Sequence, residues 1–287
     1  MAPSTNDSKV WLITGCSSGF GRELSIAARK RGDFVIATAR KIETLKDLQD
    51  LGCQALTLDV TADDATVNDI VAKAHDFYGR IDILVNNAAF VPVGAVEEAS
   101  SEEVQAIFDT NFFGLLRVTR AVLPYMRAKR SGMIANIGSQ GGYAPFVGCG
   151  IYCASKAAVA LVSQTLRLET APLGIEVTTI ELGHFQTSVL SKGVIHQKVI
   201  SDYDDVTKEY KEAVLLGTAP ASDTVLGAQA VLEALTKTGR CVGRALPSRM
   251  PLGVIYDVLQ GALTLGQQEL NDWKDFTDPE TFPLHAN

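Results

Sequence analysis

The stretch Thr14-Gly15-Cys16-Ser17-Ser18-Gly19-Phe20-Gly21 joins a short apolar run, residues 10–14, to a segment with helical periodicity. Glycines at such a junction permit a tight turn, close approach of the backbone to a pyrophosphate and close packing of helix on strand. The helix N-terminus presents free N–H groups to the phosphates. A bare turn is the alternative. The position directly after a strand favours a phosphate-binding loop formed by Gly15, Ser17, Ser18, Gly19, Phe20 and Gly21.

Strands and helices alternate on the carboxyl side of this loop. The apolar runs predict strands at residues 10–14, 34–38, 55–58, 81–86, 133–138 and 175–180, and helical periodicity predicts helices at 20–31, 42–51, 63–78, 101–129 and 151–170. Apolar strands separated by helices indicate a parallel sheet buried on both faces. Right-handed connections then give a doubly wound α/β sheet, the Rossmann fold, with helices on both faces. We expect one domain over residues 1–287.

The pattern weakens after residue 183. We expect a helix at residues 223–236, a strand at 242–246, a chain break between Pro247 and Pro251, and a last helix within 252–270. Ligands of doubly wound proteins lie beyond the carboxyl ends of the strands. The sequence therefore predicts a cofactor-binding and catalytic core at 9–183, with a substrate lid and C-terminal extension at 184–287.

Charge and composition exclude several classes of protein. The 287 residues hold 26 Lys plus Arg against 33 Asp plus Glu, a net charge of −7, which disfavours nucleic acids and anionic membranes. No apolar run approaches the roughly 20 residues of a membrane span, and the first residues lack the features of a signal peptide. The five cysteines form no Cys-x-x-Cys pair, so we expect free thiols, no metal site and a cytoplasmic protein.

The end of the second predicted strand indicates which dinucleotide binds. An acidic residue there would bind the ribose 2′-hydroxyl of NAD, whereas an arginine accommodates the 2′-phosphate of NADP. The chain reads Ala39-Arg40-Lys41. This favours NADP(H), with Arg40 as the principal phosphate contact and Lys41 in support, although a solvated basic helix start is the alternative. Asp59 and Val60, after the third strand, are candidates for the adenine amino group and ring.

A tyrosine–lysine pair predicts acid–base chemistry. Tyr152 and Lys156 stand at i and i+4, on one helical face. A fixed cation beside a phenol favours the phenolate and lowers a pKa that is otherwise near 10. Tyr125 and Lys129 have the same spacing. Only Tyr152 follows a serine, Ser139, at the carboxyl end of a predicted strand, so we interpret Tyr125 and Lys129 as ordinary helix residues.

These motifs, with Asn86-Asn87-Ala88 and Asn111 in order, resemble the short-chain dehydrogenase/reductase family over residues 9–190. The Thr14–Gly19 opening is similar to its hydroxysteroid and retinol dehydrogenase branch, and the C-terminal segment resembles fungal ketoreductases of that group. The resemblance implies a homodimer or homotetramer, formed through the long helices near residues 105–130 and 151–170.

The resemblance also implies a role for each matching residue. Tyr152 would be the general acid or base, Lys156 would lower the pKa of Tyr152 and hold the nicotinamide ribose, and Ser139 would bind the substrate oxygen. Asn111 would support a proton-relay water near Lys156. Asn87 and Ala88 would lie under the cofactor.

Two positions depart from the family pattern. Ala89 replaces the glycine that usually follows Asn-Asn-Ala, and Leu182-Gly183 replaces Pro-Gly after the sixth strand. Gly183 still permits the backbone to approach the nicotinamide, and Thr187 remains available for its carboxamide. The catalytic set is complete, so we expect an active enzyme.

The substrate pocket is expected beside Ser139 and Tyr152. The glycine-rich segment 140–150 contains apolar and aromatic residues that favour an apolar or aromatic ketone, although a flexible connector is the alternative; the candidates are Gln140, Tyr143, Phe146 and Cys149. His184 is a further pocket candidate, whereas His196 more simply has a structural role. The leading hypothesis is an NADP(H)-dependent carbonyl reductase, or the reverse alcohol dehydrogenase. The alternatives are a catalytically silent regulatory binding protein and an NADP(H)-binding enzyme of non-redox biosynthesis.

Overall fold

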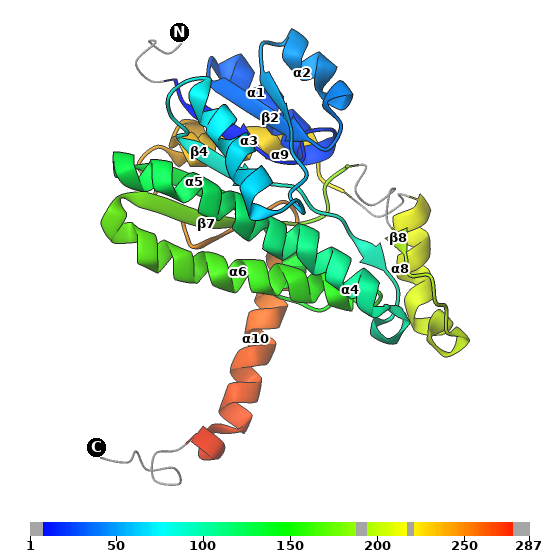
Figure 1. Ribbon diagram of the computed structural model, residues 1–287. Coiled ribbons are helices and arrows are strands. Elements are labelled where there is room, and N and C mark those ends of the chain that lie inside the picture. Colours follow the sequence, from blue (N-terminus) through cyan, green and yellow to red (C-terminus); the bar gives the residue numbers. More distant parts are fainter. Residues whose placement is uncertain (1–7, 188–193, 217–220, 278–287) are drawn as a thin grey trace.

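A computed structural model describes residues 8–187, 194–216 and 221–277 of the chain (Figure 1). Within them, seven parallel strands form one sheet in the order β3-β2-β1-β4-β6-β7-β9. The strands are β1 (Val10–Ile13), β2 (Phe34–Ala39), β3 (Gln54–Thr57), β4 (Ile83–Asn86), β6 (Gly132–Ile137), β7 (Ile175–Leu182) and β9 (Arg249–Leu252). The strand order reverses between β1 and β4, with β2 and β3 added on one side of β1 and the later strands on the other, as in a Rossmann fold, so the predicted fold class is confirmed.

Helices cover both faces of this sheet (Figure 1). One face carries α1 (Gly19–Arg31), α2 (Lys46–Asp50) and α9 (Thr224–Thr236), and the other carries α3 (Asp64–Asp76), α5 (Leu115–Lys129) and α6 (Gly150–Thr170). Short turns of helix connect them: η1 (Ile42–Leu45), η2 (Val96–Glu98), η4 (Gln140–Gly142), η5 (Ala171–Leu173) and η7 (Gly239–Cys241).

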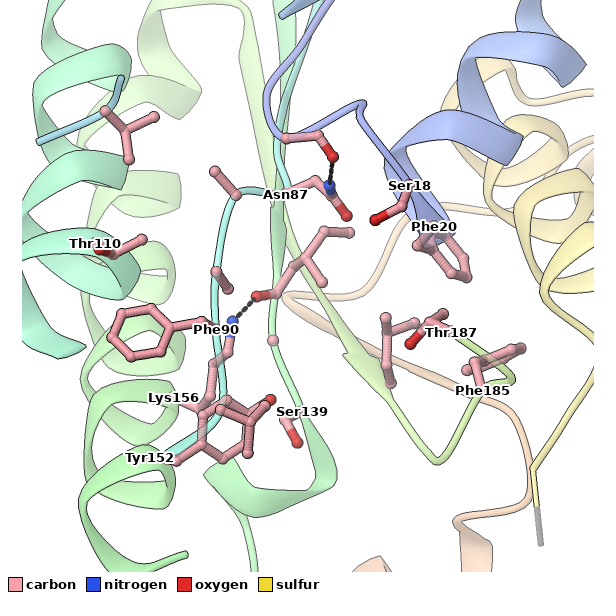
Figure 2. Close-up of a pocket in the computed structure, with 18 of the residues that line it drawn as sticks. Ser18, Phe20, Asn87, Phe90, Thr110, Ser139, Tyr152, Lys156, Phe185 and Thr187 are labelled. Carbon is pink, nitrogen blue, oxygen red and sulfur yellow. Dashed lines mark hydrogen bonds between the residues drawn. The ribbon is translucent and has the colours of Figure 1, made fainter. Parts of the chain in front are cut away.

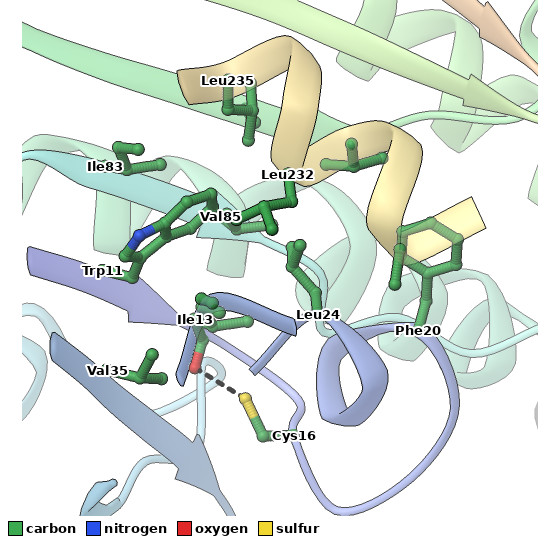
Figure 3. Packing of buried hydrophobic residues seen from close by; sticks show 14 of the residues in the cluster. Trp11, Ile13, Cys16, Phe20, Leu24, Val35, Ile83, Val85, Leu232 and Leu235 are labelled. Atoms are coloured by element: carbon green, nitrogen blue, oxygen red, sulfur yellow. Dashed lines mark hydrogen bonds between the residues drawn. The ribbon is translucent and has the colours of Figure 1, made fainter. Parts of the chain in front are cut away.

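The alternation of side chains along β1 creates two cores. Trp11 and Ile13 point to the α1 and α9 side, where they pack with Leu24 (Figure 3). Val10 and Leu12 point to the α3 and α5 side. All four are buried, which is why the strand reads as a continuous apolar run rather than an alternating one.

The long helix expected at residues 101–129 is interrupted. It consists of α4 (Ser101–Phe108), a π-helical turn η3 (Asp109–Gly114) and α5. The sequence Ser100-Ser101-Glu102-Glu103 predicts a capping box at its start. The structure confirms it, because Ser100 and Glu103 exchange side-chain and backbone hydrogen bonds. Apolar periodicity does not distinguish one extra residue in a turn, so the sequence missed the interruption.

The C-terminal predictions are partly wrong. Helix α9 matches the expected 223–236, but the strand expected at 242–246 lies instead at β9 and contains Pro251. A proline is tolerated there because β9 is an edge strand, where a missing N–H removes no ladder hydrogen bond. The last helix, α10 (Tyr256–Asp272), begins after a turn in which Gly253 has φ of 96°, and η8 (Lys274–Thr277) follows it.

Residues 194–216 form a cover tied to the β4–α4 connection. β8 (Val194–Ile195) pairs with β5 (Pro92–Val93), and η6 (Ser201–Tyr203) leads into α8 (Asp204–Leu216). The buried Glu98 carboxylate accepts hydrogen bonds from the Ile200 N–H at 2.9 Å and the Lys211 ammonium at 3.3 Å. α8 therefore lies where a lid was predicted, whereas α9 and β9 belong to the layers of the core. The division at residue 183 stays a prediction.

Helix α10 projects away from the body of the protein (Figure 1). Leu259 near its start is buried, and from Leu263 onward its side chains are exposed. None of the helices in the described part of the chain is both long and apolar enough to cross a membrane.

Candidate active site

A cavity of about 740 Å³ opens at the carboxyl ends of the central strands. Most of the predicted site residues line it: Gly15, Ser17, Ser18, Phe20, Arg40, Asp59, Val60, Asn87, Ala88, Ser139, Gln140, Phe146, Cys149, Tyr152, Lys156, Gly183, His184 and Thr187. Five of them stand back from the cavity wall: Gly19, Gly21, Lys41, Asn111 and Tyr143. The fold therefore brings both predicted halves, the glycine loop and the Tyr–Lys pair, to one cavity.

The glycine loop is joined to the segment after β4. Thr14 Oγ1 accepts hydrogen bonds from the N–H groups of Asn87 and Ala88, at 2.9 and 3.0 Å. Gly15 has φ of 71°, and a Cβ there would come within 2.9 Å of the Ala88 Cα. A Cβ on Gly21 would overlap the Asn87 amide. These two glycines thus permit the loop to lie close to the cavity floor, and the N-terminus of α1 faces the cavity beside Ser18 (Figure 2).

The far end of the cavity combines a cation with an acid. Arg40, exposed after β2, lines the wall there together with Asp59. Asp59 Oδ1 accepts hydrogen bonds from the backbone N–H and the hydroxyl of Thr61, at 3.0 and 2.8 Å, which fixes the carboxylate. Lys41 is exposed but does not reach the wall.

Ser139, Tyr152 and Lys156 converge at the other end (Figure 2). The Tyr152 phenol is hydrogen-bonded to the Ser139 side chain, whose Oγ also accepts the Gly141 N–H at 3.1 Å. The Lys156 ammonium donates to the Ile137 carbonyl at 2.7 Å and lies 5.8 Å from the centre of the Tyr152 ring. A hydroxyl, a phenol and an ammonium group thus share one corner of the cavity.

Burial determines the charge state of this corner. It raises the pKa of the Tyr152 phenol, with the Ser139 hydrogen bond opposing it, and it lowers the pKa of Lys156 to about 8. The lowered Tyr152 pKa predicted from the i, i+4 pair is therefore wrong for this structure. The reason is that desolvation disfavours the phenolate more than its neighbours favour it.

Asn111 lies behind the cavity wall, in the π-helical turn. Its side chain binds both backbone groups of Phe90, at 3.1 Å each, and donates to the Ser155 hydroxyl at 3.2 Å. Asn111 therefore fixes the segment that carries Phe90. Its part in a proton relay stays a prediction. Tyr143 points elsewhere as well, with its ring 3.4 Å from the Arg249 guanidinium carbon.

The substrate end of the cavity is apolar. Phe146 and Cys149 pack there with Val91 and Tyr210, and Phe90 also lines the cavity. Sequence reasoning missed Phe90, Val91 and Tyr210. Tyr210 comes from α8, so only the tertiary fold could reveal it. Among the described residues that line the cavity, Arg40 and Lys156 are the only Arg or Lys. Burial lowers the pKa of His184, which favours its neutral form.

Other lining residues were also missed. Phe185 packs edge-on against Phe20 with ring centres 5.5 Å apart, between α1 and the segment after β7. An aromatic residue directly after Gly183-His184 is the signal that could have found it. The remaining lining residues are Ala39, Leu58, Thr61, Ala89, Ala106, Asp109, Thr110, Ile137, Gly138 and Leu182.

Comparison with known proteins gives consistent matches. The family model for short chain dehydrogenases matches residues 9–197. The NADPH-dependent 1-acyldihydroxyacetone phosphate reductase of Schizosaccharomyces pombe is 34% identical over 221 residues, covering 76% of this chain and 74% of the relative. A short-chain dehydrogenase from Streptomyces avermitilis, a solved structure, superposes with a TM-score of 0.86 at 37% identity, covering 96% and 98% of the two chains. A variant of actinorhodin polyketide ketoreductase solved with NADPH gives 0.72 at 30% identity, covering 90% and 99%.

Proposed function

Because the chain belongs to the short-chain dehydrogenase family and is an oxidoreductase of that type, we propose that it is an NADP(H)-dependent carbonyl reductase. The observation that carries this proposal is the convergence of Ser139, Tyr152 and Lys156 at the end of a cavity whose other end holds the glycine loop and Arg40. One end can bind a dinucleotide while the other presents acid–base groups to a small molecule.

The cavity wall fits the cofactor. Gly15, which leaves no room for a Cβ, allows the backbone of the loop to approach a pyrophosphate, and the N-terminus of α1 attracts its charge. Arg40 would hold the 2′-phosphate, with Asp59 and Val60 at the adenine and Gly183 and Thr187 at the nicotinamide. The cofactor supplies the hydride when bound. NADPH in the names of two similar proteins supports this assignment.

The site residues supply a proton and hold the carbonyl. Ser139 donates a hydrogen bond to the substrate oxygen and stabilises the negative charge that develops on it. Tyr152 gives that oxygen its proton. Burial raises the pKa of the Tyr152 phenol, so this residue enters the reduction step protonated, as a proton donor must. Lys156, whose pKa is lowered to about 8 by burial, is still mostly protonated at neutral pH and places a positive charge beside the phenol.

The lining of the substrate end favours an uncharged, apolar or polycyclic ketone. Phe90, Phe146 and Tyr210 line the cavity with aromatic rings. Burial raises the pKa of the Cys149 thiol to about 12, so the thiol stays neutral. The name of the Schizosaccharomyces pombe relative indicates that its substrate carries a phosphate. A substrate of that kind would need a cation at this end of the cavity. The described lining offers none beyond Arg40 and Lys156.

The proposal includes a homodimer or homotetramer in the cytoplasm. Leu161 and Leu168 on the outer face of α6 are 67% and 77% exposed, and the exposed Ala154 and Ala157 continue their stripe at helical spacing. An apolar stripe along a long helix favours packing against another helix. The five free thiols suit a reducing compartment.

Tyr152→Phe tests the proposed function. We expect turnover of α-tetralone, an apolar ketone, with NADPH to fall at least about 100-fold, the usual contribution of a general acid, with the Kd for NADPH unchanged. Tyr125→Phe is the matched control, because Tyr125 has the same spacing to a lysine but stacks on His75 outside the cavity. Full activity of Tyr152→Phe would refute the mechanism. NADPH binding without turnover by the wild-type protein, across a panel of ketones, would favour a regulatory protein, and turnover without net NADPH consumption would favour a non-redox enzyme.

A further inference from the structure

A buried ion pair lies behind Ser139. Glu181, near the end of β7, accepts a hydrogen bond through Oε1 from Arg249 Nε at 2.6 Å, and Arg249 begins the neighbouring strand β9. The Glu181 carboxylate is fully buried and the Arg249 side chain is 15% exposed. Neither residue lines the cavity, so neither contacts a ligand bound there.

The pair holds both ends of the turn that carries Ser139. Glu181 Oε2 accepts the backbone N–H of Ser139 at 2.9 Å. Arg249 Nη2 donates to the carbonyl of Gly142 at 3.1 Å. The Arg249 guanidinium also lies 3.4 Å over the ring of Tyr143, the next residue. The segment from Ser139 to Tyr143 is thus anchored at its start by the anion and at its end by the cation.

The surroundings of this ion pair show that the fold accommodates a buried charge behind Ser139. A Cβ on Gly138 would come within 2.5 Å of Glu181 Oε2, so only glycine fits directly before Ser139. Burial raises the pKa of Glu181 and the Arg249 guanidinium opposes that shift, which shows that the carboxylate depends on its partner. Buried ion pairs are weak stabilisers compared with apolar packing of the same volume. Stability alone therefore does not account for an ion pair at this place.

We propose that Glu181 and Arg249 are positioning residues that act through Ser139, holding the 139–143 turn so that the Ser139 hydroxyl stays beside the Tyr152 phenol. The inference rests on the proposed carbonyl reduction. A displacement of a reacting group by about 1 Å can cost on the order of 100-fold in rate, so an anchored backbone matters here. The two strands that carry the pair are adjacent in the sheet, which makes the anchor rigid.

Glu181→Gln and Arg249→Lys are the first variants. Glutamine has the shape of glutamate but one acceptor oxygen, which cannot serve both the Ser139 N–H and Arg249 as the carboxylate does. We expect kcat with α-tetralone to fall about tenfold or more, while KM and the Kd for NADPH change less than about twofold. Lysine keeps the positive charge but has one ammonium group in place of the guanidinium, which binds both Glu181 and the Gly142 carbonyl. We therefore expect Arg249→Lys to lower kcat less than Glu181→Gln does. Glu233→Gln, which breaks the ion pair with the exposed Arg240 far from the cavity, is the matched control and should leave kcat unchanged.

The decisive measurement is a double-mutant cycle with Ser139→Ala. If Glu181 acts through Ser139, adding Glu181→Gln to Ser139→Ala lowers kcat by less than about twofold further, because the group it positions is already gone. Losses that multiply would overturn the inference, since a general structural role would affect the enzyme with or without the serine hydroxyl.

A double variant tests the inference if Glu181→Gln alone does not fold. If Glu181→Gln does not yield a folded protein, Glu181→Gln with Arg249→Met removes both charges together, which proteins tolerate better than one unpaired charge. Its kcat should still be low, and the same cycle with Ser139→Ala applies. Wild-type kcat in this double variant would overturn the inference.

These measurements distinguish a failure of the proposed carbonyl reduction from a failure of the positioning role of Glu181 and Arg249. If the wild-type protein and Ser139→Ala reduce α-tetralone equally, or if the wild type reduces no ketone of the panel, the proposed function is refuted and the inference falls with it. If Ser139→Ala loses activity as expected but the losses multiply, the inference alone is refuted.

Discussion

Replacing Arg40 tests the coenzyme assignment. Arg40 is exposed, follows β2 and reaches the wall at the end of the cavity where the adenosine is proposed to bind, whereas its neighbour Lys41 does not reach that wall. Arg40→Gln removes the charge and keeps much of the side chain. We expect this variant to lose its preference for NADPH over NADH while retaining turnover with both.

The magnitude follows from the exposure of Arg40. A hydrogen bond to a charged group contributes about 1.5–3 kcal/mol. An exposed guanidinium belongs at the lower end of this range, because water screens it. About 1.4 kcal/mol corresponds to a tenfold change in binding, so the ratio of kcat/KM for NADPH to that for NADH should fall about tenfold. Arg40→Asp should reverse the preference, since an acid at this position can accept the ribose 2′-hydroxyl of NADH and repels the phosphate.

The assay measures kcat/KM for both coenzymes with α-tetralone at two ionic strengths. Because the proposed contact is exposed, the wild-type preference should decline between about 0.05 and 0.5 M salt, and the Arg40→Gln preference should change much less. Lys41→Gln is the comparison variant and should change the ratio less than about twofold. A tenfold loss in Lys41→Gln, or an unchanged preference in Arg40→Asp, would refute the assignment.

Two further predictions concern the stability and the assembly of the protein. Burial lowers the Lys156 pKa from 10.5 to about 8, so the unfolded chain holds this proton over that interval while the folded chain does not. The free energy of unfolding, measured by denaturant titration, should therefore rise with pH between pH 8 and 10.5 by up to about 3 kcal/mol more in the wild type than in Lys156→Met. A difference in unfolding free energy between the two proteins that does not change with pH would contradict the burial of a lysine with a lowered pKa. Leu161→Asp with Leu168→Asp places two charges on the exposed stripe of α6 and should yield a smaller species by size-exclusion chromatography with light scattering, whereas an unchanged mass would exclude this face as the interface.

The features that the sequence predicted well are local ones. The apolar runs, the glycine loop and the capping box at Ser100 each depend on residues a few positions apart, so their pattern is visible in the chain itself. The doubly wound architecture followed from the handedness of the connections between strands. The helix containing Tyr152 and Lys156 also follows a local pattern, and its predicted bounds were nearly right: it runs from Gly150 to Thr170.

The features that it missed are produced by distant parts of the chain. Tyr210 reaches the cavity because β8 pairs with β5 and because Lys211 is bound to Glu98. The raised pKa of Tyr152 comes from burial, which the spacing of Tyr152 and Lys156 does not report. Glu181 directly follows the strand expected at residues 175–180, and an acid after an apolar run is a signal that could have prompted a search for its partner.

Strand β9 contacts two segments of the proposed site that are far from it in the sequence. Arg249 at its start holds the turn that carries Ser139 through the Glu181 pair, and the Leu252 carbonyl at its end accepts the Gly183 N–H at 2.9 Å. Gly183 is the position where a Pro-Gly turn was expected and Leu182 stands in place of proline. Pairing with β9 fixes this turn by a hydrogen bond where proline would restrict its φ angle. The edge strand that contains Pro251 therefore supports both the Ser139 turn and the nicotinamide side of the proposed site, and the chain beyond β7 contributes to the core through α9 and β9 as well as to the cover through α8.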